Sequence, residues 1–470
     1  MGDARAARHA TIRAWADESF DPDVALVWNP PGSLDDEGVP PRSLHQIPQS
    51  AWYLLDLLER GDAETAARVA DALLAIQYAD PGTPWDGTFA RFLEWPHPAG
   101  GAVEWEDYDP NWRQFVGISF ALALRRHRSL LGDDLAGRLE ASIESAVDGE
   151  QASARLHWHY TNIALQHAWL LVEAGRTEAG EALAEQIWSH WSEHRAFPEY
   201  NSPTYDGVDL WALALWRGHC DSDVLRQHGA EMEAGLWTTV ADRFHAGLGN
   251  IAGPYTRAYG LDCARHVAKV AVVMDTSGID GAPLPPALTA ASHSHDLLSI
   301  PALRLAPSAI PAAARANLED FTGERRVEQV ITTWPTRRES TAWLGDDLMI
   351  GAEDGESNWS GWYQFVAGTV HWRRTDGSIG VLRYVPDGPP RGVAEAGVLR
   401  VGGPGVLEVH EPEPDGVGHT TRASLGAPGV HILEPGRTQL DGLDVTISAD
   451  GVGFVAEFAP RPNIPTRTPR

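Results

Sequence analysis

Apolar residues recur every three to four positions through the first 280 residues, which is the spacing of amphipathic helices. The segments with this spacing are 51–58, 63–77, 115–128, 135–146, 163–173, 177–191, 210–217 and 222–240. Gly61, Gly132, Gly175 and Gly218 fall in the short breaks between segments, where helix C-termini are expected. The first part of the chain is therefore predicted to consist of helical hairpins.

Longer connections of a different kind alternate with these breaks. They are rich in aromatic and polar residues and cover 29–49, 85–113, 155–162, 197–209 and 251–262. Because every second connection of stacked hairpins lies at the same end, we expect these loops to lie together. An open solenoid usually binds through a concave helical face and does not need such loops, so we favour a closed α/α toroid. The loops would then surround the mouth of its central cavity.

The pattern changes after residue 280. Residues 281–311 are rich in Pro, Ala and Ser, and we expect a linker at 281–324. Short runs bounded by Gly, Pro and Asp then predict strands at 327–334, 341–344, 348–352, 362–372, 380–384, 398–401, 406–410, 420–424, 430–433, 443–448 and 452–458. Asp376-Gly377 separates two of these runs and is a hairpin signal. The predicted fold class is α+β multidomain, with an α/α toroid at 1–280, an antiparallel β-sandwich at 325–460 and a flexible tail at 461–470.

The composition argues against several classes of protein. The formal net charge is −28, Lys269 is the single lysine and no run rich in Lys or Arg exists, so we expect no nucleic-acid or membrane partner. Cys220 and Cys263 form neither a zinc motif nor a disulfide framework. The chain has no P-loop, GxGxxG, GxSxG or EF-hand pattern, so we expect no cofactor and no metal.

Residues 1–20 are polar and lack the apolar segment of a signal peptide. This predicts a cytoplasmic location, or secretion if a signal has been removed. The chain has 19 Trp, more than a core requires, and many of them lie in the polar loops. Because flat aromatic rings stack on sugar rings, we expect an oligo- or polysaccharide substrate. The oligomeric state is unknown from the sequence.

The loop 197–209 is the most informative candidate site. Ser202 and Pro203 can begin the next helix, because Ser suits the cap and Pro the first turn. Tyr200 and Asn201 would then precede that helix, and Tyr205 would lie on its first turn. Glu199 belongs to the same loop. The alternative is a capped helix start whose tyrosines simply pack.

The loop 155–162 carries His157 and His159 on either side of Trp158. In an extended stretch the two imidazoles would point the same way. No third ligand at zinc spacing is visible, so we expect a general base or a group that neutralises a substrate carboxylate. Structural burial of either histidine remains the alternative.

The loop 251–262 places Arg257 between Tyr255 and Tyr259. This arrangement is typical of an anion clamp with aromatic walls, because a guanidinium pairs with a carboxylate through two hydrogen bonds. The alternative is that Arg257 pairs with Asp262 or Glu199.

The loop 85–113 gives a weaker signal, because any polar loop contains such residues. Its candidates are Asp86, Glu94, Asn111, Trp112 and Arg113. In the predicted sandwich, the segment 358–362 could project back over the mouth of the toroid.

The order of helical hairpins and sandwich, with Tyr, His, Asn and Arg in the loops, resembles the α/α-toroid polysaccharide lyases such as the heparinase and alginate lyase groups. The segments EYNSPTY at 199–205 and GPYTRAY at 253–259 are similar to those of heparinase-like proteins. The resemblance covers most of the chain in architecture and these loops in motif. It implies β-elimination on a uronic acid.

In that reaction Arg257, His157 and Asn201 would neutralise the substrate carboxylate, and Tyr205 or Tyr200 would act as the base. The candidate catalytic residues are Tyr205, Tyr200, His157, His159 and Arg257, and the candidate substrate-binding residues are Asn201, Glu199, Trp158, Trp112, Tyr255, Tyr259, Asn111, Arg113 and Asp86.

Two other functions remain open at this point. A glycoside hydrolase on the same scaffold needs a pair of carboxylates, for which Asp86, Glu94, Glu199, Asp206 and Asp209 are candidates. A glycan-binding protein without catalysis is the third possibility. It is less favoured, because a binding protein needs aromatic and amide groups more than it needs His and Arg.

Overall fold

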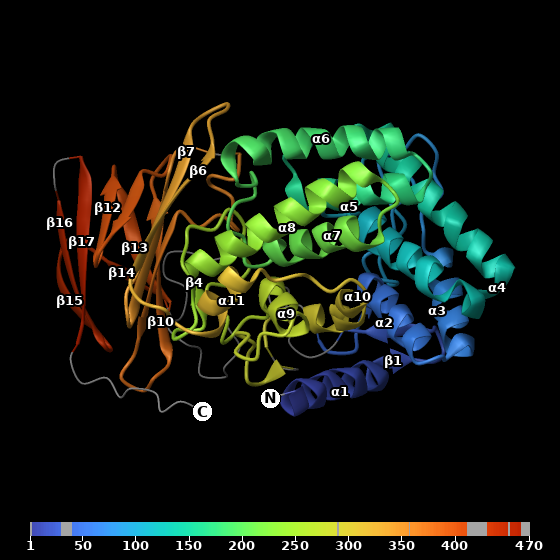
Figure 1. Ribbon diagram of the computed structural model, residues 1–470, viewed down its shortest axis with the longest axis horizontal. Coiled ribbons are helices and arrows are strands. Elements are labelled where there is room, and N and C mark those ends of the chain that lie inside the picture. Colours follow the sequence, from blue (N-terminus) through green and yellow to red (C-terminus); the bar gives the residue numbers. More distant parts are fainter. Residues whose placement is uncertain are drawn as a thin grey trace. The chain divides into compact units, whose positions relative to one another are not determined.

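The computed structural model describes residues 2–29, 40–288, 291–356, 358–410, 430–449 and 452–461. These residues form helices and antiparallel sheets, so the protein is α+β (Figure 1). The chain folds into two compact units, and each unit draws on separate stretches of the sequence. The helical unit comprises Met1–Ser189, Val208–Glu233 and Ala287–Ala309, and the strand-rich unit comprises His190–Gly207, Ala234–Pro286 and Ile310–Arg470. The domain bounds expected from the sequence stay a prediction.

Helices α1 to α8 follow one another through the first half of the chain. Their bounds are α1 Gly2–Glu18, α2 Ile47–Glu59, α3 Ala63–Ala75, α4 Trp112–Ser153, α5 Thr161–Glu173, α6 Thr177–His194, α7 Tyr205–His219 and α8 Asp223–Arg243. Three short strands, β1 Phe20–Asp21, β2 Leu26–Trp28 and β3 His45–Gln46, form a small sheet between α1 and α2 in the chain. No described helix is long and apolar enough to cross a membrane.

Helix ends follow local sequence signals. The Asp62 carboxylate accepts a hydrogen bond from the backbone N–H of Thr65, which caps α3. Gly61 precedes that cap with φ of 77°, a left-handed conformation that glycine adopts without steric cost. The 42-residue element α4 covers the two helices expected at 115–128 and 135–146. Helical geometry breaks at His127 and at Gly132, whose φ is 73°, so the predicted glycine break is present.

The segment 281–324 contains short helices. It holds the 3₁₀ helix η2 Ser294–Ser299 and the α-helices α10 Ile300–Leu305 and α11 Ala312–Glu319. Pro301 lies in the first turn of α10, where a missing backbone N–H costs no hydrogen bond. The prolines of this segment had favoured a linker, but Pro301 lies in the first turn of a helix.

The strand-rich unit contains a seven-stranded and a five-stranded antiparallel sheet. The first runs β14-β13-β10-β9-β8-β7-β6 and the second β11-β12-β17-β16-β15. The strands of the first are β6 Arg325–Thr332, β7 Arg338–Leu344, β8 Leu348–Asp354, β9 Gly368–Arg373, β10 Ile379–Pro386, β13 Gly405–His410 and β14 Val430–Leu433. Those of the second are β11 Gly392–Glu395, β12 Val398–Gly402, β15 Gly436–Leu440, β16 Leu443–Ala449 and β17 Gly453–Pro460.

One apolar core lies between these two sheets. It joins Leu348, Trp372 and Leu382 of the first sheet to Val445 and Phe454 of the second. Alternate residues of a strand face the same side, so each strand contributes every second residue to this core.

The turn predicted at Asp376-Gly377 is present, because β9 and β10 pair from Arg373 and Ile379 onward and Gly377 has φ of 83°. Strands β11 and β15 were not predicted. The strand expected at 420–424 and residues 462–470 of the expected tail lie outside the described residues.

The remaining elements of the strand-rich unit lie before and after the predicted loop 251–262. They are the short strands β4 Phe244–His245 and β5 Asn250–Ile251 and the helix α9 Lys269–Thr276. The loop after β5 pairs with the segment before β9 through an isolated bridge between Tyr255 and Val366. This bridge connects two stretches that lie more than 100 positions apart in the sequence.

Candidate functional site

A buried arginine of the strand-rich unit links residues from three separate segments. The guanidinium of Arg257 donates from Nη2 to the hydroxyl of Tyr205 at 2.6 Å, from Nη1 to Glu199 at 2.9 Å and from Nε to the side-chain oxygen of Gln364 at 2.8 Å. Its side chain is 4% exposed. The structure thus brings Tyr205, Glu199 and Arg257 together, and the pairing of Arg257 with Glu199 is the one foreseen as an alternative to an anion clamp.

Aromatic rings surround this guanidinium. The Cζ atom of Arg257 lies 3.7 Å from the ring centre of Tyr205, 5.1 Å from that of Trp359 and 5.0 Å from that of Trp362. The hydroxyl of Tyr259 lies 2.8 Å from the hydroxyl of Tyr205. Tyr205 and Tyr259 are half-buried, so they are the members of this group that a ligand can reach. We call Glu199, Tyr205, Arg257, Tyr259 and Gln364 the Arg257 cluster.

Ser202 positions the tyrosine. Its hydroxyl oxygen accepts a hydrogen bond of 3.2 Å from the backbone N–H of Tyr205, which is a normal helix cap at the start of α7. The same hydroxyl donates to the backbone carbonyl of Arg257. One serine therefore holds the first turn of α7 and the loop 251–262 together.

Asn201 and Tyr255 support the backbone of that loop. Asn201 has φ of 51°, and its Nδ2 donates to the carbonyls of Ala252 at 2.8 Å and Pro254 at 2.6 Å. Tyr255 is buried and donates its hydroxyl hydrogen to the carbonyl of Ile251. Both residues, expected to bind substrate, here use their donor groups on the protein backbone.

Tyr200 lies in a different environment from Tyr205. Its hydroxyl accepts a hydrogen bond of 2.8 Å from Nε of Arg243, whose other nitrogens donate to the carbonyl of Gly253 and to the hydroxyl of Ser340. Tyr200 is 3% exposed. Burial raises the pKa of Tyr200, and the neighbouring Arg243 acts against this rise. The buried pair of Tyr200 and Arg243 contacts the loop 251–262 through the carbonyl of Gly253.

A small cavity lies beside Glu199. It has a volume of about 10 Å³ and is lined by Asn201, Tyr200 and Asp206 among others. Burial raises the pKa of Asp206 to about 8, and the Glu199 carboxylate acts in the same direction. Oδ2 of Asp206 and Oδ1 of Asn201 are buried and have no hydrogen-bond partner among the described residues. Asp206 is therefore a neutral acid at neutral pH.

A larger open pocket includes one of the rings that cover Arg257. It has a volume of about 390 Å³, and its wall includes Trp362, Tyr363 and Arg383. Tyr363 accepts a hydrogen bond of 2.8 Å from Nε2 of Gln364, which itself accepts from Arg257. A continuous chain of hydrogen bonds therefore runs from the wall of this pocket to the Arg257 cluster. Such a volume is within the range of small-ligand sites.

The predicted histidines lie in the helical unit. The rings of His157 and His159 are stacked, with centres 5.2 Å apart and an angle of 13° between their planes. The ring of Trp158 meets that of His159 edge-on. His157 is exposed, whereas Trp112, at the start of α4, is half-buried. The two imidazoles thus lie side by side, although Trp158 and His159 lie in a turn and not in the extended stretch that the prediction assumed.

Other predicted residues of the helical unit make structural contacts. Arg113 is buried and donates to the backbone carbonyl of Asp86 at 2.7 Å and to the Glu150 carboxylate at 3.3 Å. Asn111 donates to the hydroxyl of Tyr160 at 3.0 Å and accepts from Arg155 at 2.9 Å. These contacts hold the loop 85–113 to the segment before α5.

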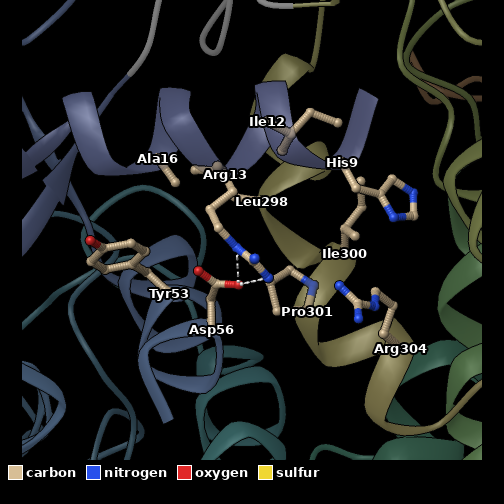
Figure 2. A pocket seen from close by; sticks show the side chains of 10 residues that line it. All are labelled: His9, Ile12, Arg13, Ala16, Tyr53, Asp56, Leu298, Ile300, Pro301 and Arg304. Carbon is tan, nitrogen blue, oxygen red and sulfur yellow. Dashed lines mark hydrogen bonds and ion pairs between the residues drawn. The ribbon is translucent and has the colours of Figure 1, made fainter. Parts of the chain in front are cut away.

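A further pocket of the helical unit, with a volume of about 20 Å³, contains none of the predicted site residues. Figure 2 shows Arg13 of α1 reaching toward Asp56 of α2, with Ile12 and Leu298 beside them. The guanidinium and the carboxylate are 2.8–2.9 Å apart. Arg13 and Asp56 are thus paired with each other, and the pocket lies where α1 meets α2, η2 and α10.

Sequence reasoning missed Gln364 and Arg243. Gln364 lies two positions after the segment 358–362, which had been noted as a loop that could project back over the toroid mouth, and this was the available signal. Arg243 ends α8 and carried no signal, because a basic residue in the last turn of a helix is common.

One comparison with known proteins gives a match. A family model described as a domain of unknown function, DUF8769, matches residues 11–307, more than half of the chain, and the chain belongs to this family. No curated protein matches the chain.

Proposed function

We propose that this member of the DUF8769 family cleaves a uronic-acid-containing glycan by β-elimination, with Tyr205 as the catalytic base. The observation that carries the proposal is the hydrogen bond of 2.6 Å from the Arg257 guanidinium to the Tyr205 hydroxyl. A charged donor at this distance stabilises the negative charge that forms when a phenol gives up its proton. The Tyr259 hydroxyl, at 2.8 Å, is a second hydrogen-bond partner of the Tyr205 hydroxyl.

The reaction needs a base that can also return a proton. Tyr205, as phenolate, would take the proton from C5 of the uronate, and the released electron pair would form the C4–C5 double bond as the C4–O bond breaks. The leaving oxygen would then take the proton from the Tyr205 phenol. Tyr205 ends in its starting state, and no redox partner is required.

Arg257 then has a different role from the anion clamp expected from the sequence. Three of its nitrogens already donate to Tyr205, Glu199 and Gln364. Because Glu199 offsets its positive charge, the pair attracts a substrate carboxylate only weakly. Arg257 is better suited to hold and polarise the Tyr205 hydroxyl.

The pocket beside Trp362 supports a carbohydrate substrate. Trp362 is 38% exposed and Tyr363 is 37% exposed, so both rings offer a face or an edge to a ligand. Aromatic rings with polar groups next to them are suited to the apolar faces and hydroxyls of sugars. The hydrogen-bond chain through Gln364 would connect a sugar at this wall with the Arg257 cluster.

The same geometry disfavours the hydrolase alternative for two of its candidates. Glu199 is fully buried and paired with Arg257, and Asp206 is buried beside a small cavity. A glycosidase needs one carboxyl to protonate the leaving oxygen and a second to act as nucleophile or base, so both must reach the substrate. The proposal includes the resemblance to heparinase-like lyases and a closed toroid of helical hairpins. The run of consecutive helices from α2 to α8 supports both parts.

The test is absorbance near 235 nm, where the unsaturated uronate product absorbs, during incubation with a panel of uronate-containing glycans and EDTA. We expect a rising signal with the wild type and a loss of about 100-fold or more with Tyr205→Phe, as for other general bases. Tyr78→Phe is the control, because the Tyr78 hydroxyl is buried without a hydrogen-bond partner among the described residues.

Each other outcome has a clear meaning. Turnover by Tyr205→Phe at the wild-type rate would remove Tyr205 as the base. Sugar release without absorbance would favour a hydrolase. Glycan binding without any product would favour a binding protein.

A further inference from the structure

Three potential metal ligands lie together at the start of η2 in the helical unit. His293, His295 and Asp296 each offer one ligand atom, and these atoms all lie within 4.8 Å of one another. Among the described residues, no other set of three His, Cys, Asp or Glu side chains meets this criterion. The proposed Tyr205 chemistry does not use these residues.

The backbone brings the two imidazoles together. His293 precedes η2 with φ of 55° and ψ of 28°, a left-handed conformation that is uncommon for residues other than Gly, although Asn, Asp and His adopt it more often than the rest. The ring centres of His293 and His295 are 4.9 Å apart. Left-handed backbone at such a residue costs about 1–3 kcal/mol and persists where the surroundings impose it.

Burial alternates along this stretch. Ser292 and Ser294 are buried, whereas His293, His295 and Asp296 are partly exposed. Helix η2 itself packs against α1, α2 and α10. The segment is therefore anchored by its small residues and by η2, and the three potential ligands remain accessible from solvent.

We propose that His293, His295 and Asp296 bind one divalent transition-metal ion, such as Zn²⁺ or Co²⁺. Two imidazoles and one carboxylate suit these ions, whereas Mg²⁺ and Ca²⁺ prefer all-oxygen ligands. The ligand set carries one negative charge from Asp296 when both imidazoles are neutral, which favours a dication. Zinc–ligand distances of about 2.1 Å imply ligand separations of about 3.4 Å, so the ligand atoms, which lie within 4.8 Å of one another, need to close by at most about 1.4 Å.

This site would use none of the residues proposed for glycan cleavage. Three protein ligands leave coordination positions for water, and the ion would hold the turn before η2 in its left-handed form. Because the ion binds the folded chain, it would also raise the thermal midpoint.

The experiment uses the full chain, first treated with EDTA and dialysed. Binding of Co²⁺ alone is followed by its visible absorbance, and the bound metal is counted by mass spectrometry after dialysis against Zn²⁺. We expect one ion per chain, and an affinity at least about tenfold lower for His295→Ala and for Asp296→Asn. The double variant His157→Ala/His159→Ala is the matched control, because it removes a histidine pair of the same spacing. It should bind like the wild type.

Circular dichroism verifies that each variant is folded, and Asp296→Asn keeps the shape of the side chain if His295→Ala proves unstable. Absence of bound metal in the wild type would overturn the proposal. So would unchanged binding in both η2 variants, or loss of binding in the control alone. None of these outcomes depends on glycan cleavage, so the metal site and the proposed function fail or stand separately.

Discussion

Replacing Asp206 with Asn would make the stability of the protein less dependent on pH. Asp206 is buried beside a cavity, and burial raises its pKa to about 8 from an ordinary value of 3.8. An acid with a raised folded-state pKa stabilises the fold fully below its unfolded pKa and loses this contribution as pH rises through the folded pKa. Asn has nearly the same shape and never ionises, so the loss is absent from the variant.

The size of the effect follows from the pH interval. Between pH 5 and pH 8 the unfolded chain carries an ionised Asp206 while the folded chain keeps it neutral. Each pH unit in this window costs the wild type about 1.4 kcal/mol, so three units amount to as much as about 4 kcal/mol. Above pH 8 both states are ionised and the difference becomes constant.

The measurement is the thermal midpoint of wild type and Asp206→Asn at pH 5, 6, 7, 8 and 9. We expect the variant to gain on the wild type steadily from pH 5 to pH 8 and then to keep its advantage. The control is Asp223→Asn, which makes the same change at an exposed carboxylate in the first turn of α8. A constant difference between wild type and Asp206→Asn over this range would refute the reasoning.

Two other predictions concern packing and buried charge. A Cβ atom at Gly351 would lie 1.8 Å from the carbonyl oxygen of Gly253, so Gly351→Ala should destabilise the folded protein by about 3 kcal/mol or more. Gly137 lies on α4 with open space around it, so Gly137→Ala should stabilise the folded protein by about 0.5–1 kcal/mol. Equal thermal midpoints for these two variants would contradict this explanation. Glu353→Gln leaves Arg338 buried without its carboxylate, which lies at 2.8 Å, and should cost about 3–5 kcal/mol in urea unfolding. A cost below about 1 kcal/mol would mean that water reaches Arg338.

Periodicity predicted the long helices well because their burial is strongly one-sided or complete. It gave no signal for α1, where Ile12, Trp15 and Ala16 are buried but most other residues are polar. This helix is held in part by the ion pair between Arg13 and Asp56, which lie 43 positions apart. A contact over that separation leaves no periodic trace, so it could not be read from the sequence.

The candidate site was predictable where a local sequence signal determines the position of a residue. Ser202 before a proline predicts a capped helix, and the cap places Tyr205 on the first turn of α7. Gln364 was not predictable in this way. It reaches Arg257 because the loop 251–262 pairs with the segment before β9, where Tyr255 and Val366 exchange two backbone hydrogen bonds of 2.9 Å. This pairing depends on tertiary structure, and a scan for local motifs does not detect it.

The charge balance around the Arg257 cluster limits how a uronate could be recognised there. Arg257 pairs with Glu199 at 2.9 Å, and Arg383, in the wall of the larger pocket, pairs with Glu408 at the same distance. Both guanidiniums are largely buried, so their charges are already compensated inside a protein with a net charge of −28. Long-range attraction of an anionic sugar is therefore weak at these residues, and selection would depend on short-range contacts with rings and hydroxyls. Arg257 would then act on Tyr205, and Trp362 and Tyr363 would hold the sugar.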